Sequence, residues 1–379
     1  MSNHVWHFCA LTLGFAAITA CSGAPDEKSE DLADNAEALT GHSRTGAVFT
    51  MSNAANGNSV LAFERAADGS LEAAGETTTG GLGTGASLGS QGSVTLSGDN
   101  RFLLVVDAGS NEISAFAVHG THLTLKSKVA SGGMMPTSVT ERDHLVYVLN
   151  AGSTANISGL WLDPLGHLTP IAGSTRALSA AAPAPAQVAI APRGLGVVVT
   201  EKGTNLIDVF DMRRDGTLGT AQSHASSGGV PYGFGFSPRG TLVVSEAMPG
   251  AVSSYSLSRW HGFMTTSASV PDNQKAPCWV VVTQDGRFAY TANAGSQSIS
   301  GYSLSDNGSL QLLDSSGVTG SMGQNSKPLD MAVDGHKHLY VVDAGNHALD
   351  GFEIGQTGIL SPVASTGGMP DSIVGVAAM

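Results

Sequence analysis

Two glutamates stand where the surrounding sequence pattern otherwise places Asn or Asp. Glu201 and Glu246 each follow a short apolar stretch, as in Val199-Thr200-Glu201-Lys202-Gly203. Asn and Asp are favoured at such points because they tolerate positive φ and bond their own backbone. A carboxylate that turn geometry does not require can serve as a general acid or base. We therefore take Glu201 and Glu246 as candidate catalytic residues, with a structural role as the alternative for each.

Other polar and aromatic residues recur at related positions and are candidates for binding a substrate. Lys202 can bind an anionic group, and Trp279 can stack on a ligand, although packing between structural units is its alternative role. For the Asn and Asp residues among them, the simpler interpretation is an ordinary hairpin turn. The candidate substrate-binding residues are Lys202, Asn150, Gln187, Trp279, Asn293, Asp330, Asp107 and Asp343.

The sequence contains no His, Cys or Asp spacing that indicates a zinc site. We expect neither a metal nor an organic cofactor, although oxygen ligands from separate segments leave Ca²⁺ or Mg²⁺ binding open. The string Gly85-Ala86-Ser87-Leu88-Gly89 matches a nucleophile elbow, but it lies in a glycine-rich stretch with no helix after it. We assign it no catalytic role.

The candidate residues belong to repeats. Seven segments share an apolar strand that ends in a polar residue, at positions 53, 107, 150, 201, 246, 293 and 343. The mean period is about 48 residues, which is typical of propeller blades or solenoid units. The segments are short, alternate in polarity and are rich in Val, Tyr, Phe and Thr, so they predict strands. We predict an all-β, seven-bladed β-propeller with four antiparallel strands in each blade.

The two ends of the repeat array complement each other. An inner strand is predicted to begin at Pro136, Pro185, Pro231, Pro277 and Pro328, since Pro is tolerated at the start of a strand. Pro370-Asp371-Ser372-Ile373-Val374-Gly375-Val376 is a further copy with nothing after it, and the first repeat lacks its own copy. The N- and C-terminal strands should therefore pair in one blade and close the ring. On this topology, the candidate residues gather on one concave, partly acidic face.

The N-terminal sequence indicates export. Residues 8–20 form an apolar run of signal-peptide length that ends in Ile18-Thr19-Ala20-Cys21, which resembles a bacterial lipobox. We predict a lipoprotein signal peptide at 1–20, lipidation of Cys21, a disordered acidic tether at 21–45, and the propeller at 46–379. The protein would then be anchored in the cell envelope, on the periplasmic side of the outer membrane.

Composition limits the partners. The net charge of −13, without any basic cluster, argues against nucleic-acid binding. Of Cys9, Cys21 and Cys278, only Cys278 lies in the predicted propeller, so an internal disulfide cannot form there. We expect a monomer that binds a small lactone or carbohydrate-like ligand and contacts the membrane through its lipid anchor.

The sequence over residues 46–379 resembles the lactonase family of seven-bladed propellers, the group of 6-phosphogluconolactonase and the carboxymuconate-lactonising enzymes. The resemblance is carried by Val199-Thr200-Glu201-Lys202-Gly203-Thr204-Asn205, Ala276-Pro277-Cys278-Trp279-Val280 and Ala289-Tyr290-Thr291-Ala292-Asn293-Ala294-Gly295. It implies hydrolysis or formation of a sugar or muconate-type lactone, without a redox cofactor, by a carboxylate acid/base. Glu201 is the position proposed for that carboxylate.

Two other classes of function stay open. A propeller presents a rigid ring of loops, so a tethered form can act as a non-catalytic binding module for a ligand or partner protein. It can also serve as a subunit of an envelope assembly, which an exposed apolar patch would favour. If the chain is an enzyme, its predicted export favours a lactone found outside the cytoplasm.

Overall fold

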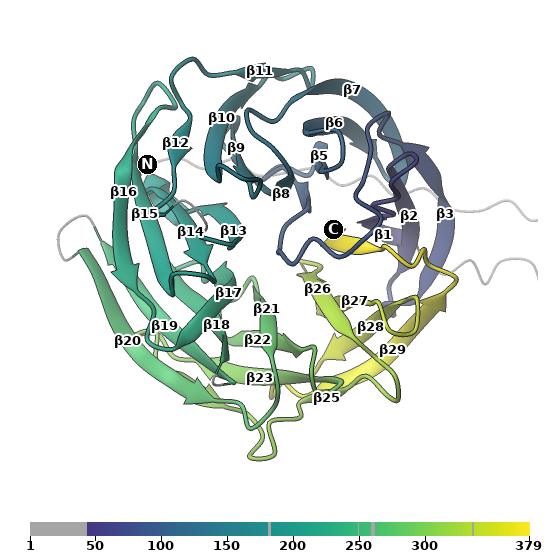
Figure 1. Ribbon diagram of the computed structural model, residues 1–379. Coiled ribbons are helices and arrows are strands. Elements are labelled where there is room, and N and C mark those ends of the chain that lie inside the picture. Colours follow the sequence, from purple (N-terminus) through teal and green to yellow (C-terminus); the bar gives the residue numbers. More distant parts are fainter. Residues whose placement is uncertain (1–43, 181–182, 249, 259–261, 336) are drawn as a thin grey trace, which may run out of the picture. The chain divides into compact units, whose positions relative to one another are not determined.

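The computed structural model describes residues 44–379 except 181–182, 249, 259–261 and 336. The described residues form seven antiparallel sheets arranged as the blades of a ring (Figure 1). The predicted all-β, seven-bladed propeller is thereby confirmed. The predicted signal peptide, the predicted lipidation site Cys21 and nearly all of the predicted tether lie outside the described residues, and the first strand begins at Arg44.

Each blade runs from an inner strand at the axis to an outer strand at the rim. The first blade is β30 (Val374–Ala378), β1 (Arg44–Met51), β2 (Ser59–Ala66) and β3 (Leu71–Thr78). The second is β4 (Val94–Leu96), β5 (Phe102–Asp107), β6 (Glu112–His119) and β7 (His122–Ala130). The third is β8 (Pro136–Arg142), β9 (Leu145–Asn150), β10 (Asn156–Leu162) and β11 (Leu168–Pro170), with β12 (Arg176–Ala177) also paired to β10.

The other four blades follow the same order. The fourth is β13 (Pro185–Ile190), β14 (Val197–Glu201), β15 (Leu206–Met212) and β16 (Leu218–Ala225), and the fifth is β17 (Gly229–Phe236), β18 (Thr241–Met248), β19 (Ala251–Ser258) and β20 (Gly262–Pro271). The sixth is β21 (Pro277–Val282), β22 (Phe288–Asn293), β23 (Ser298–Leu304) and β24 (Leu310–Leu312), with β25 (Gly320–Ser321) also paired to β23. The seventh is β26 (Pro328–Val333), β27 (His338–Asp343), β28 (Ala348–Ile354) and β29 (Leu360–Gly367).

The second strand of each blade forms the core. Every residue of β5, β9, β22 and β27 is buried, because both faces of these strands pack against neighbouring blades. Strands buried on both faces are expected to be continuously apolar, as Leu103-Leu104-Val105-Val106 is. The outer strands β3 and β7 are mostly exposed. This gradient explains why the second strands gave the clearest repeat in the sequence.

Two inner strands begin at a different residue from the predicted proline. β17 begins at Gly229 rather than Pro231, and Pro231 borders a register irregularity that extends to Phe234, where a missing N–H is tolerated. β30 begins at Val374 rather than Pro370, because Ile373 N bonds Pro370 O in a turn. The inner strands β8, β13, β21 and β26 begin at Pro as predicted.

The ring is closed by the two ends of the propeller chain, as predicted. β30 pairs antiparallel with β1 in the register Val48↔Ala378 and Thr50↔Val376. Beyond β30, Met379 N donates to Ala47 O at 2.9 Å, and Ala47 N donates to Met379 O at 3.2 Å. The first blade is therefore complete only when β30 and Met379 are in place.

A buried cluster of charged groups joins this blade to the seventh. Arg65 on β2 places Nε 3.3 Å from Asp334 Oδ2, and His338 Nδ1 lies 2.7 Å from the same oxygen. The three side chains are at most 2% exposed. Arg65 Nε also lies 3.3 Å from Met379 O, so the Arg65–Asp334–His338 cluster meets the C-terminal strand.

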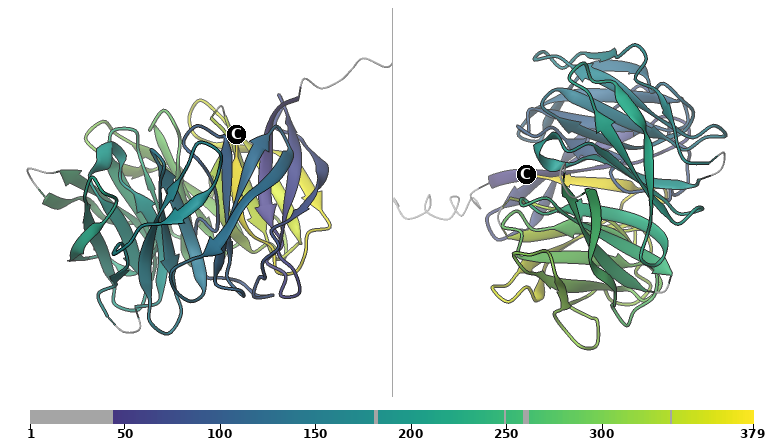
Figure 2. Two further views of the ribbon diagram at one scale, coloured as in Figure 1. Left: turned by 90° about the horizontal axis from the view of Figure 1, so that it is seen from above. Right: turned by 90° about the vertical axis from the view of Figure 1, so that its left-hand side faces the viewer.

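The ring has two faces, seen edge-on in Figure 2. Inner strands begin and second strands end at one face, which we call the plug face because a loop described below blocks the axis there. We call the other, where tight turns join inner to second strands, the turn face. In the described part of the chain, no helix has the length and hydropathy needed to cross a membrane.

Candidate functional site

The connection from β3 to β4, residues 79–93, runs inward to the axis of the ring (Figure 1). Its last part, Leu88–Gly92, hydrogen-bonds to the third, fourth, sixth and seventh blades, and we call it the plug segment. Gly89 and Gly92 have φ of 61° and 79°, in the left-handed region that favours glycine. The glycine-rich sequence therefore allows this loop to thread between the blades.

Main-chain and side-chain bonds fix the plug segment. Ser90 O accepts from Trp279 Nε1 at 2.8 Å, and Ser90 Oγ donates to Thr137 O at 2.8 Å. The Gln91 side-chain amide bonds both main-chain groups of Val280, at 2.6 and 2.8 Å. Gly92 O accepts from Val139 N at 2.8 Å. The segment thus closes the axis of the ring on the plug face.

A cavity of about 300 Å³ lies along the axis on the other side of the plug segment. Its lining residues run from the middle of the inner strands to their ends, so the cavity extends toward the turn face. This volume is at the lower end of the range for ligand sites. The lining residues are Gln91, Gly92, Val94, Thr95, Leu96, Val139, Thr140, Gln187, Val188, Ala189, Asp330, Met331, Ala332, Val333, Val376, Ala377 and Ala378.

Asp330 is the ionisable side chain among these lining residues. Its Oδ2 accepts from Gly92 N and its Oδ1 from Met331 N, both at 2.9 Å. Burial raises the pKa of Asp330 to about 7, although these two hydrogen bonds act in the opposite direction. A carboxylate oxygen can accept more than one hydrogen bond, so each oxygen retains capacity for a ligand or water. Asp330 is therefore suited to proton transfer near neutral pH.

Other polar groups on the cavity wall differ in what they can offer a ligand. Thr140 Oγ1 accepts from Ile190 N at 3.3 Å, which leaves its own hydroxyl proton available to a ligand. The Gln187 amide bonds both main-chain groups of Phe234, at 2.6 and 3.0 Å. Thr95 Oγ1 donates to Val139 O at 2.9 Å. Asp330 and Thr140 are thus the side chains with the most capacity for new bonds.

The structure places the predicted catalytic residues inside the blades. Glu201 is fully buried and accepts bonds from Ser179 N at 3.0 Å, from Ser179 Oγ, and from Thr204 Oγ1 at 2.6 Å. Glu246 is also fully buried and accepts from Gly228 N at 2.8 Å and Ser253 Oγ at 2.5 Å. Through these hydrogen bonds, both side chains hold loops at the plug-face end of their own blade in place. Their catalytic role stays a prediction.

Four of the eight predicted binding residues occupy equivalent buried positions at the ends of second strands. Asp107 accepts from Ser114 Oγ at 2.7 Å, and Asn293 donates to Ser300 Oγ at 2.8 Å, seven residues further on in each case. Asn150 donates to Asn156 Oδ1, and Asp343 accepts from Lys327 N. The structure brings Gln187 and Asp330 together at the cavity, but not these four residues.

Lys202 and Trp279 lie on the plug-face side of the plug segment. Lys202 Nζ donates to Gly89 O and sits 4.6 Å from the centroid of the Tyr232 ring, which is 5.1 Å from the Trp279 ring. Burial lowers the pKa of Lys202 and raises that of the neighbouring Cys278 to about 12. Both predicted binding residues therefore hold the plug segment in place.

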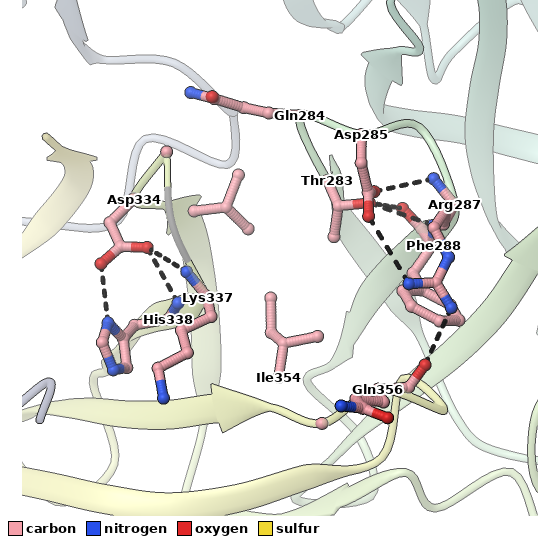
Figure 3. A pocket seen from close by; sticks show the side chains of 13 residues that line it. Thr283, Gln284, Asp285, Arg287, Phe288, Asp334, Lys337, His338, Ile354 and Gln356 are labelled. Carbon is pink, nitrogen blue, oxygen red and sulfur yellow. Dashed lines mark hydrogen bonds and ion pairs between the residues drawn. The ribbon is translucent and has the colours of Figure 1, made fainter.

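A second concave surface lies between the sixth and seventh blades on the turn face (Figure 3), with a volume of about 330 Å³. Its charged groups are already paired. Asp285 accepts from Thr283 Oγ1 at 2.6 Å and Arg287 N at 3.0 Å, and Arg287 also donates to Gln356 O. A larger groove of about 540 Å³, lined among others by Ser97, Asp99 and Phe102, lies at the corresponding place between the second and third blades. We therefore attribute these grooves to the repeated turn sequence and take the axial cavity as the candidate site.

Sequence reasoning missed Gln91 and Thr140. The glycine-rich stretch before β4 was noticed only as a weak nucleophile-elbow match, although the length of this connection is itself a signal that the loop has a special task. Thr140 carries no signal, because it occupies an ordinary strand position. Within the described residues, no group of three or more His, Cys, Asp or Glu side chains is placed to hold a metal ion.

Residues 243–371 match the family model described as "Lactonase, 7-bladed beta-propeller". The match confirms the resemblance to the lactonase family. The matched residues include Trp279, Asp330, Asp334 and His338. No curated protein sequence matches the chain significantly.

Solved structures share the fold of this propeller. A Bacteroides uniformis protein with the provisional name 6-phosphogluconolactonase is 18% identical, with a TM-score of 0.70, over 88% of this chain and 99% of that one. The periplasmic gluconolactonase PpgL of Pseudomonas aeruginosa is 15% identical, with a TM-score of 0.70 and the same coverage. Virginiamycin B lyase of Staphylococcus aureus is 13% identical, with a TM-score of 0.52, over 72% of this chain and 83% of that one.

Proposed function

We propose that this protein is a lactonase-like enzyme that hydrolyses a lactone in the axial cavity, with Asp330 as its general base. The observation that carries the proposal is a buried carboxylate with free hydrogen-bonding capacity on the wall of a ligand-sized cavity. A concave site that holds an ionisable group with a shifted pKa is a common location of catalysis. The lactonase-family match supports the class of reaction.

The chemistry needs one group that moves a proton. The Asp330 carboxylate takes a proton from water as the water oxygen bonds to the lactone carbonyl carbon. The ring C–O bond then breaks, and protonated Asp330 returns the proton to the leaving ring oxygen. The product is the open hydroxy acid, which releases its carboxyl proton to solvent. The Thr140 hydroxyl is a donor that can stabilise the negative charge developing on the carbonyl oxygen.

The pH dependence of turnover tests this proposal. A general base must be ionised, so kcat/KM should rise about tenfold per pH unit below the pKa and level off above pH about 7. The measurement is initial-rate hydrolysis of a lactone panel between pH 5 and pH 8, corrected for spontaneous hydrolysis. A profile without a rise in this range would contradict a base with the pKa of Asp330. Turnover of no lactone would instead favour a non-catalytic binding module.

We further propose that the protein is exported and anchored in the cell envelope through a lipid on Cys21. The support is the lipobox-like sequence Ile18-Thr19-Ala20-Cys21 after an apolar run. Two or three acyl chains would hold the protein on a membrane. In a bacterial host, Cys21→Ser should move the protein from the membrane to the soluble fraction and abolish incorporation of labelled palmitate. Unchanged fractionation and labelling of the variant would refute the anchor.

A further inference from the structure

Three blades share a buried side-chain contact between their second and third strands. The second-strand residue is an Asp, Glu or Asn at the plug face, and the third-strand residue is a serine seven positions later. The pairs are Asp107–Ser114, Glu246–Ser253 and Asn293–Ser300, with polar atoms 2.7, 2.5 and 2.8 Å apart. In each pair one member donates a hydrogen bond to the other, so the buried polar groups satisfy each other.

The fourth blade has an aspartate in place of this serine. Asp208 on β15 follows Glu201 by seven residues, and it pairs in register with Val199 on β14. Glu201 and Val199 point to the same face of β14, because side chains alternate along a strand. The Glu201 and Asp208 carboxyl groups therefore face each other and interact directly. Two carboxylates cannot donate to each other, and buried charges are normally paired or bound to a metal.

The Asp208 carboxylate lacks the partners that Glu201 has. Asp208 is fully buried, yet neither of its oxygens accepts a hydrogen bond from a described residue. Ser223, opposite on β16, and the Ser179 main chain lie near it but outside hydrogen-bonding geometry. Glu201 accepts from Ser179 N, Ser179 Oγ and Thr204 Oγ1. The charged group that acts most strongly on Asp208 is Glu201, which has the same sign.

We propose that Glu201 and Asp208 bind a Ca²⁺ ion at the plug-face end of the fourth blade. Ca²⁺ takes six to eight oxygen ligands in flexible geometry, and carboxylates can bind it through one or both oxygens. Asp208 offers two unused oxygens, and hydroxyl oxygens of Ser179, Thr204 and Ser223 stand around the pair. Mg²⁺ demands near-octahedral geometry and retains several waters, so it suits this buried pair less well.

The position of the pair gives the ion access and an effect on the fold. Ser179 and Ser223 are exposed, so an ion can enter from solvent without opening the blade. Ser179 belongs to the connection between the third and fourth blades, which the ion would fasten to β14 and β15. Lys202, the residue after Glu201, holds the plug segment through Gly89 O. The bound ion would thus stabilise the strand end that anchors the plug segment, whichever reaction the protein catalyses.

Equilibrium dialysis of the EDTA-treated full chain against radioactive Ca²⁺ measures binding directly. We expect a dissociation constant of about 10⁻⁴ to 10⁻³ M, which is typical of extracellular Ca²⁺ sites. Asp208→Ser installs the residue of the three blades described above and should weaken binding at least tenfold. Asp350→Ser is the matched control and should leave it unchanged, because Asp350 is partly exposed and its neighbour Asp343 already accepts from Lys327 N and Gly345 N. Absent binding, or equal binding by wild type and Asp208→Ser, would refute the site.

Thermal unfolding distinguishes a bound ion from a proton shared by the two carboxyl groups. At pH 8, about 10 mM Ca²⁺ should raise the Tm of the wild-type protein by about 2–5 °C relative to EDTA, and Mg²⁺ should raise it less. Asp208→Ser should not respond, and in EDTA it should melt no lower than wild type because it lacks one of two like charges. If Ca²⁺ has no effect and lowering the pH to 5 in EDTA stabilises only the wild type, a shared proton compensates the pair and the Ca²⁺ site is wrong. A larger shift with Mg²⁺ would overturn the choice of ion.

Discussion

Asp330→Asn should lower kcat for lactone hydrolysis by about 10² to 10⁴, the usual contribution of a general acid or base. The amide keeps the size of the side chain and can still accept the bond from Gly92 N, but it cannot take a proton from water. The measurement is kcat and KM at pH 8 for whichever lactone the wild-type protein turns over fastest. Loss of kcat with little change in KM is the expected pattern.

Asp107→Asn is the matched control for a buried carboxylate outside the cavity. The repeat itself places Asn at the equivalent positions 53, 150 and 293, so the substitution is compatible with the blade. Turnover should stay within a few-fold of the wild-type value. The same experiment ranks the competing carboxylates, because Glu201→Gln or Glu246→Gln would abolish turnover only if that residue were the base. Full activity of the Asp330→Asn protein would exclude Asp330.

The stability of the Asp330→Asn protein separates loss of chemistry from loss of fold. Burial raises the pKa of Asp330 from 3.8 to about 7, so its contribution to stability is fully present below about pH 4 and is lost as the pH rises through 7. The ionisation penalty is roughly 4 kcal/mol at high pH, from 1.36 kcal/mol per pKa unit. The amide does not ionise, so the Asp330→Asn protein does not have this penalty. The unfolding free energy of the variant minus that of the wild type should therefore be higher at pH 8 than at pH 5.

Asp334→Ala should lower the free energy of unfolding by about 3–5 kcal/mol, the usual cost of breaking a buried ion pair by removing one partner. The substitution leaves Arg65 and His338 buried without the carboxylate that both now contact. Because Arg65 also meets Met379 O, the loss falls on the blade that closes the ring. Urea unfolding followed by tryptophan fluorescence measures the change.

An exposed ion pair provides the comparison. Asp306 lies 2.5 Å from Arg239, but its side chain is 88% exposed. Exposed pairs contribute about 0–1 kcal/mol, so Asp306→Ala should change the unfolding free energy by no more than that. Similar losses in the Asp334→Ala and Asp306→Ala proteins would mean that the Arg65–Asp334–His338 cluster does not stabilise the closed ring.

The fold was predictable because it depends on a repeated local pattern. The second strands are buried on both faces, so each appears in the sequence as an apolar run that ends in a polar residue. The pairing of β30 with β1 was predictable because the first repeat lacks an inner strand and an additional inner strand follows the last repeat. No long-range geometry was needed for either conclusion.

The site was less predictable because the cavity is assembled from separate blades. Asp330 and Gln187 were selected for their position near the start of an inner strand, which is visible in sequence. That Gln91 would reach the axis depends on the width of the ring and the path of a fifteen-residue connection, residues 79–93. The unusual choice of Glu at 201 has a structural reason as well: its longer side chain reaches Ser179 N, 22 residues earlier in the chain.

The fold alone does not choose the chemistry. A lyase from Staphylococcus aureus and a gluconolactonase from Pseudomonas aeruginosa both share the ring with this chain at 13–15% identity. Function in such folds depends on particular side chains at the site. For the reaction proposed here that side chain is Asp330, which the Asp330→Asn experiment tests.

The position of β30 has a consequence for how the protein is made. The strand β1 finds its inner neighbour only in β30, more than 300 residues later, so the ring cannot close before β30 has been synthesised. Until then, the edge of β1 is free to pair with another chain, which is a known route to aggregation. Contacts between residues more than 300 positions apart also slow folding. The open edge of β1 is therefore protected from pairing with another copy only once β30 is in place.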